Sequence, residues 1–117
     1  MPVEVILDVF SGRPNPRWVL SDAQTLELVR RIASLSRAQG AREPTPPDLG
    51  YRGFQLEAHD VPELPGPVHV YGGFVRLPSE VRLDPQRRTE RWLLESSSSS
   101  LEPPIHELVL HEIEGRV

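Results

Sequence analysis

Thirteen of the 117 residues are proline, and their positions restrict where regular structure can form. Proline fixes the backbone φ angle and has no amide donor, so it is disfavoured in helix interiors and in central strands. Most of the prolines lie in three segments, which cover residues 8–18, 41–50 and 60–67. We therefore predict few regular elements, joined by long ordered loops.

The segments outside these loops predict an α+β fold. Apolar alternation and helical spacing indicate strands over 3–10, 18–20, 50–59 and 68–77, and helices over 22–38 and 84–96. With a last strand at the C-terminal end, this order is the split βαβ pattern (βαββαβ) of ferredoxin-like folds. We predict a small antiparallel sheet of about four to five strands packed by two helices, and a β-roll or another sandwich of sheet and helices stays open.

Helix ends are marked by local sequence. Ser21 and Gln24 match a capping box, and Gly40 is the expected C-terminal cap of the first helix. Asp84 followed by Pro85 is the expected start of the second helix. We expect its buried side to carry Thr89, Trp92, Leu93 and Ser96, and its outward side Arg87, Arg88 and Arg91.

Two segments leave alternatives open. Gly72 and Gly73 are compatible with one bent strand or with a tight hairpin, and we favour the bent strand. Residues 105–117 read as a last strand or as a short docked helix, and we favour an edge strand because a small sheet gains from one. We predict a single globular domain over 1–98, followed by a serine-rich hinge and C-terminal segment over 99–117 that acts as an edge strand or a docking tail.

Composition excludes several classes of function. A formal charge of −4 argues against binding to nucleic acid or to anionic membranes. Cysteine is absent, which excludes disulfides, thiolate metal sites and cysteine nucleophiles. All the basic residues are arginine, which a GC-rich genome explains, and no apolar run is long enough to span a bilayer. The N-terminal run has no basic leader and no small-residue cleavage site, so we expect a cytoplasmic protein.

The Pro-rich loop 8–18 is the strongest candidate for a ligand- or partner-binding site. Its candidate residues are Asp8, Arg13, Asn15 and Trp18, to which we add Arg52 from the segment LGYRGF. Arginine forks bind carboxylate or phosphate, and an indole ring supplies an apolar wall. The structural alternative is that Asp8 pairs with an arginine, Asn15 bonds within its own turn and Trp18 lies in the core. The second reading is the commoner one for loops rich in turn residues.

Catalytic and metal signatures are weak. His106-Glu107 and His111-Glu112 superficially match a zinc motif, but the histidines are five residues apart and not four. We predict no metal, no cofactor and no catalytic residue. The arginines around 82–91 form a patch that suits an acidic partner or phosphate, or a solvated face paired with glutamates such as Glu90 and Glu95.

These observations favour a small protein that works by binding. We predict a non-enzymatic accessory or subunit of a larger protein assembly, with another protein bound through loop 8–18 or through segment 101–117. Homo-oligomer formation stays open. The alternative is a small-molecule or anion-binding domain that uses loop 8–18, with simple catalysis as a further option.

Overall fold

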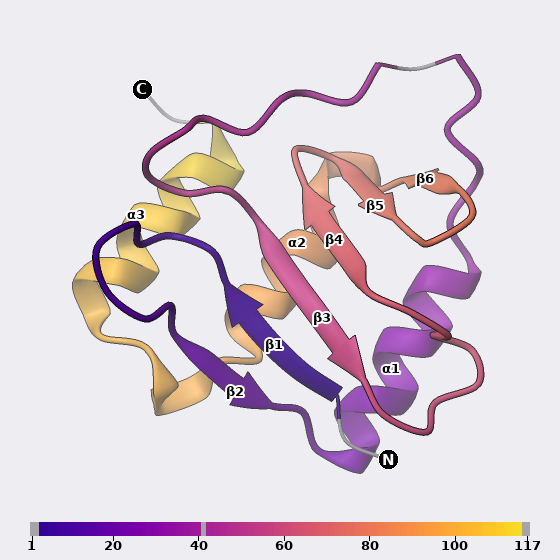
Figure 1. Ribbon diagram of the computed structural model, residues 1–117, viewed down its shortest axis with the longest axis horizontal. Helices are drawn as coiled ribbons and strands as arrows, with labels where there is room; N and C mark the ends of the chain where they lie inside the picture. Colours follow the sequence, from indigo (N-terminus) through magenta and orange to yellow (C-terminus); the bar gives the residue numbers. More distant parts are fainter. Residues whose placement is uncertain (1–2, 41, 116–117) are drawn as a thin grey trace.

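The computed structural model describes residues 3–40 and 42–115; the ends of the expected 1–98 and 99–117 segments at 1–2 and 116–117, and Ala41, lie outside the described part. Within it the protein is α+β, with an antiparallel six-stranded sheet and three α-helices (Figure 1). The strands are β1 (Val3–Leu7), β2 (Arg17–Val19), β3 (Phe54–Ala58), β4 (Val68–Tyr71), β5 (Phe74–Arg76) and β6 (Val81–Leu83). The helices are α1 (Asp22–Ala33), α2 (Arg88–Glu95) and α3 (Pro103–Glu114), with short 3₁₀ turns at Pro85–Arg87 and Ser98–Ser100.

The strand order differs from the expected arrangement. The strands lie in the order β2-β1-β3-β4-β5-β6, and every neighbouring pair is antiparallel. The α1 connection joins β2 to β3, which lie on either side of β1 and run parallel to each other because each is antiparallel to β1. These elements form one split βαβ unit, but a ferredoxin-like fold needs a second one, and here β4, β5 and β6 follow as consecutive antiparallel neighbours and two helices come after β6. The α+β class and the antiparallel sheet are therefore confirmed, and the sheet has more strands than expected. A ferredoxin-like topology is not confirmed.

One face of the sheet is covered by helices and holds the core. Val3, Val5 and Leu7 alternate along β1 and are completely buried. Their neighbours on the same face include Phe54 and Val70, which meet apolar residues from all three helices. Figure 1 shows α2 behind β3 and β4, while the opposite face of the sheet is turned toward the viewer. Because successive side chains of a strand point to opposite sides, that opposite face carries Glu4, Ile6, Gln55, Glu57 and His69, most of which are polar.

The segment 68–77 is a hairpin, so the expected single bent strand is wrong. Gly72 and Gly73 form the two-residue turn, and Tyr71 pairs with Phe74 on either side of it. Both glycines have positive φ angles, of 64° and 91°. A two-residue hairpin turn of this kind needs positive φ at both positions, which glycine adopts without a steric penalty. The turn chemistry therefore outweighs the continuous apolar pattern of the segment.

The first helix starts where the sequence predicts and ends earlier. The capping box is confirmed: the Ser21 hydroxyl accepts from the Gln24 amide, and the Gln24 side chain accepts from the Ser21 amide. The helix ends at Ala33, so Gly40 is not its cap. The chain that follows pairs with β6 instead, through the Leu83 amide to the Ser36 carbonyl and the Ala38 amide to the Val81 carbonyl. Pairing with the sheet edge thus replaces the last expected turn of helix.

The second helix is capped by Asp84 across a kink. The Asp84 carboxylate accepts from the amides of Thr89, at 2.9 Å, and Glu90, at 3.1 Å. Between them Gln86 and Arg87 both have positive φ angles, of 58° and 54°. The kink turns Arg87 toward the protein, so its expected outward position is wrong. Of the four residues expected on the buried side, Thr89 and Leu93 are buried, whereas Trp92 and Ser96 are partly exposed.

The C-terminal segment is a helix and not the favoured edge strand. Pro103 and Pro104 occupy its first turn, where a missing amide donor costs nothing. Val109 and Ile113, one helical turn apart, are buried against α2, and Leu101 is buried just before the helix. The spacing of these apolar residues follows the helical repeat. Among the described residues, no helix has the length and apolar character that crossing a membrane would require.

Candidate functional site

The loop 8–18 is held in one conformation by Asn15. Its side-chain oxygen accepts from the amides of Val9, at 3.0 Å, and Phe10, at 2.8 Å. Its side-chain nitrogen lies 3.5 Å from a carboxylate oxygen of Asp8. An asparagine that satisfies two backbone donors acts as an internal brace of the loop. Asn15 is therefore used by the protein itself.

Backbone hydrogen bonds tie both ends of this loop to the sheet. The Leu7 amide donates to the Pro16 carbonyl at 2.9 Å, and the Asp8 amide donates to the Gly53 carbonyl at 3.0 Å. The Arg52 amide donates to the Asp8 carbonyl at 2.8 Å, and the Arg52 guanidinium lies 3.6 Å from the Asp8 carboxylate. Asp8 and Arg52 are thus brought together, as a link between the loop and the start of β3.

Trp18 lies in the core. Its ring is 7% exposed and packs edge-to-face on Phe54. Its indole nitrogen donates to the Ser96 hydroxyl at 3.0 Å, and that hydroxyl in turn donates to the Leu93 carbonyl. A buried indole N–H needs such an acceptor. Ser96, the first of the five consecutive serines at 96–100, therefore has a defined structural partner.

Arg13 is the candidate residue that faces solvent. Its guanidinium lies 3.9 Å from the centre of the Phe10 ring, within the range of a cation–π contact. The two side chains border a concavity of about 260 Å³ between the loop and the start of α3, which we call the loop groove. Its lining residues are Phe10, Arg13, Pro14, Pro16, Ser100, Leu101, Glu102 and Ile105.

The loop groove joins the two segments that the sequence singled out separately. Sequence reasoning named loop 8–18 and segment 101–117, but it did not place them side by side and did not name Phe10 or Ile105. Ile105 precedes Val109 by one helical turn, so helical spacing would have placed it on the inner side of α3. The contact between loop and helix depends on tertiary structure and leaves no local signal.

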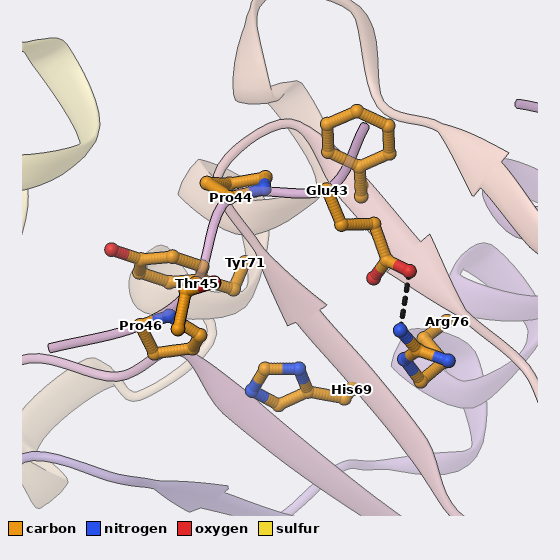
Figure 2. A pocket seen from close by; sticks show the side chains of 8 residues that line it. Glu43, Pro44, Thr45, Pro46, His69, Tyr71 and Arg76 are labelled. Atoms are coloured by element: carbon orange, nitrogen blue, oxygen red, sulfur yellow. Dashed lines mark hydrogen bonds and ion pairs between the residues drawn. The ribbon is translucent and has the colours of Figure 1, made fainter. Parts of the chain in front are cut away.

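A second concavity lies under the Pro-rich segment that precedes β3. Figure 2 shows Pro44, Thr45 and Pro46 on one side of it, with His69 facing them from β4. The ion pair between Glu43 and Arg76 closes one end of it. The volume is about 220 Å³, and Tyr71 and Phe74 supply aromatic walls. The sequence did not indicate this pocket, because its residues come from segments about thirty positions apart.

His69 has a defined tautomer when neutral. Its Nε2 atom lies 3.0 Å from the Arg52 carbonyl oxygen. A carbonyl oxygen only accepts, so Nε2 carries the proton and Nδ1 is the unprotonated nitrogen. His69 therefore links β4 to the same Arg52 whose guanidinium meets Asp8. Arg52 thus connects the pocket of Figure 2, through His69, with loop 8–18, through Asp8.

A buried polar cluster lies behind the sheet, next to α2. Glu90 is completely buried, and its carboxylate accepts two hydrogen bonds from Arg87, at 2.9 and 2.8 Å, and one from the Tyr51 hydroxyl. Arg87 also donates to the Glu112 carbonyl of α3 at 3.0 Å. The expected surface role of Glu90 is therefore wrong, because the αL kink at Arg87 directs both side chains inward.

The cluster shifts the pKa of both tyrosines upward. Burial raises the pKa of Tyr51 far above its ordinary value, and the neighbouring Glu90 carboxylate adds to the effect. Burial also raises the pKa of Tyr71, which Arg87 partly counteracts. Both phenols therefore stay protonated to a higher pH than an ordinary tyrosine, and the Tyr51 hydroxyl donates to the Glu90 carboxylate. Burial raises the pKa of Asp84 as well, while the Thr89 and Glu90 amides oppose the shift.

The arginine patch expected around 82–91 is dispersed. Arg82 donates to the Ile32 carbonyl at the end of α1 and to Glu80, and Arg91 lies 3.3 Å from Glu114. Arg88 remains exposed on α2. The four histidines do not converge, and in the described ranges 3–40 and 42–115 no three His, Asp or Glu side chains form a group suited to a metal ion.

Comparison with known proteins gives no further guide. No family model matches the chain, and neither a curated protein nor a solved structure matches it. The site is therefore interpreted from its own geometry.

Proposed function

We propose that this protein is a non-enzymatic, protein-binding accessory or subunit of a larger assembly, and that it binds its partner through the loop groove. The observation that carries the proposal is the juxtaposition of a braced, solvent-exposed loop with the start of α3 around one concavity. Ser11, Gly12, Arg13 and Pro14 are all exposed at the loop tip. A concavity of this kind is suited to receive a partner's side chain between the loop and the helix.

The loop meets two physical requirements of a binding surface. It is already ordered, because Asn15 and the backbone bonds of Leu7 and Asp8 hold it in place. Binding therefore costs little conformational entropy, which otherwise opposes association. The groove also offers an aromatic ring at Phe10 and a guanidinium at Arg13, and aromatic residues and arginine are enriched at protein interfaces.

The small-molecule or anion alternative has less support from the same loop. Asn15 is engaged with two backbone amides and Trp18 with Ser96, while Asp8 and Arg52 face each other. Of the five candidate residues, Arg13 is the one whose polar atoms face solvent with no acceptor among the described residues. One exposed guanidinium beside an aromatic ring suits a protein contact better than a specific anion site.

The test is site-specific photo-crosslinking in the source cells. A photo-reactive amino acid replaces Ser11 at the loop tip in one variant and Gln39, an exposed residue near β6, in a matched control. We expect one discrete crosslinked protein with the Ser11 variant and none with the Gln39 variant. The additional change Arg13→Ala should reduce the yield several-fold, because one guanidinium contact is lost.

Two outcomes would overturn the proposal. Equal crosslinking at positions 11 and 39 would indicate non-specific encounters. Absence of any adduct at position 11, with adducts at other exposed positions, would place the interface elsewhere. A crosslinked second copy of the chain would keep the binding role and identify the partner as the protein itself. Circular dichroism of the Arg13→Ala variant provides the control for folding.

A further inference from the structure

Three arginines from two helices meet at a concavity between α1 and α2. Arg30 and Arg31 come from the last turn of α1, and Arg88 opens α2. The concavity has a volume of about 290 Å³, and we call it the α1–α2 pocket. Its lining residues are Arg30, Arg31, Ser34, Leu35, Asp84, Pro85, Arg88 and Thr89. This grouping is absent from the sequence pattern, because Arg88 is far along the chain from the other two.

Glu27 orients the two α1 arginines. One of its oxygens lies 3.1 Å from Arg30 Nε, and the other lies 2.6 Å from Arg30 Nη2 and 2.7 Å from Arg31 Nε. Hydrogen bonds from both arginines lower the pKa of the Glu27 carboxyl, so it stays ionised near neutral pH. The Arg31 guanidinium also lies 5.3 Å from the centre of the Trp92 ring. One carboxylate thus positions two guanidinium groups side by side.

Arg88 has no carboxylate within ion-pair distance in the described part of the chain. Its Nε atom donates to the Gln86 side chain at 3.0 Å, and no hydrogen bond from its terminal nitrogens is formed within the described residues. Arg91 on the same helix is paired with Glu114, and Arg87, just before the helix, is paired with Glu90. Arg88 is therefore an unneutralised cation at the mouth of the α1–α2 pocket.

The remaining carboxylate of the pocket is turned away from solvent. Asp84 is 2% exposed, and both of its oxygens accept from amides at the start of α2. Counting Glu27 and Asp84 against the three arginines leaves a local excess of positive charge. That excess stands in a protein whose formal net charge is −4.

We propose that the α1–α2 pocket binds the phosphate group of a small molecule. Guanidinium groups present paired N–H donors that match phosphate oxygens, and they remain charged at every physiological pH. Guanidiniums that approach from two helices surround a tetrahedral anion more completely than they would a planar carboxylate. The site is separate from the loop groove, so it concerns a function additional to the proposed protein binding.

The test is a titration of the full chain by isothermal calorimetry at constant ionic strength. Inorganic phosphate and ribose 5-phosphate are the two probes, and they distinguish a bare ion from the phosphate of an organic molecule. We expect saturable one-site binding, with tighter binding of the organic phosphate because the pocket extends beyond one anion. The substitution Arg88→Ala should weaken binding about tenfold or more, the range for one lost charged hydrogen-bond pair.

The matched control is Arg42→Ala, which removes another exposed arginine that has no ion-pair partner among the described residues. It should leave the affinity unchanged. Equal weakening by Arg88→Ala and Arg42→Ala would show only general charge attraction and would overturn the proposal. If Arg13→Ala abolished binding and Arg88→Ala did not, the anion site would lie in loop 8–18 and the proposal would be wrong. The absence of saturable binding with either probe would also reject the pocket.

Discussion

Replacing Glu90 by glutamine tests the buried cluster that connects the sheet, α2 and α3. Glu90→Gln retains the shape of the side chain and removes its charge. Glu90 is completely buried, and its carboxylate receives two bonds from Arg87 and one from Tyr51. The change therefore leaves the Arg87 charge without its partner.

The expected cost follows from the burial of the pair. Removing one partner of a buried ion pair costs about 3–5 kcal/mol, because an uncompensated charge remains inside. The Arg87 side chain is 25% exposed and reaches water at one end, so we expect the lower limit, about 3 kcal/mol. That is a large part of the free energy of unfolding of a small domain, which is about 5–15 kcal/mol.

The assay is urea denaturation followed by far-ultraviolet circular dichroism. The matched control is Glu95→Gln, an exposed glutamate at the end of the same helix, for which we expect a change within about 0.5 kcal/mol. The paired change Glu90→Leu with Arg87→Met should cost less than Glu90→Gln, because it leaves no charge unpaired. The reasoning is refuted if Glu90→Gln is as stable as Glu95→Gln, or if the double variant is the least stable of all.

Three further predictions concern other parts of the fold. Burial raises the pKa of Tyr51 above its ordinary 10.0, so the contribution of the protonated Tyr51 to folding stability is fully present below pH 10 and falls as the pH rises above it. Ultraviolet absorbance should show tyrosinate from Tyr51 forming only as the protein unfolds. Ionisation of Tyr51 near pH 10 in the folded protein would contradict this. Gly53→Ala should lower the free energy of unfolding by more than about 1 kcal/mol in urea denaturation, because φ is 103° and the new Cβ would lie 2.6 Å from the Val70 carbonyl oxygen. The control Gly12→Ala should lower it far less, because no atom lies within 4 Å of the new Cβ. Truncation after Ser98 tests whether residues 1–98 form a domain without the 99–117 segment. The sheet should still form, but loss of the buried Val109 should lower the urea midpoint. An unchanged midpoint would show that α3 adds nothing to the core.

Local signals predicted the elements whose structure depends on local chemistry. The capping box at Ser21 and Gln24 and the alternation of β1 are of this kind, since each is satisfied within a few residues. The final helix also had a local signal, because Ile105, Val109 and Ile113 recur every four residues. The preference for an edge strand was wrong because it gave more weight to the benefit of an added strand for a small sheet than to this helical spacing.

The buried cluster around Glu90 and the α1–α2 pocket both depend on contacts between distant segments. Glu90 is buried because Tyr51, 39 positions away, and the αL kink at Arg87 enclose it. Positive φ at a non-glycine residue such as Arg87 has no dependable sequence signature, because the surrounding structure imposes it. Arg88 and Arg30 likewise become neighbours only when α1 and α2 pack. Residue types alone identified loop 8–18, but not which of its side chains would face outward.

The pairing of residues 36–38 with β6 makes the two borders of the sheet unequal. At β6 the Ser36 carbonyl and the Ala38 amide already occupy hydrogen-bonding positions of the strand, so an incoming chain finds that border blocked. At the other border, β2 has β1 as its one strand neighbour within residues 3–40 and 42–115, and it carries Val19 with 60% exposure. An unpaired strand edge is a template for strand addition, so if copies of this chain associated in this way, the sheet would extend at β2 and not at β6.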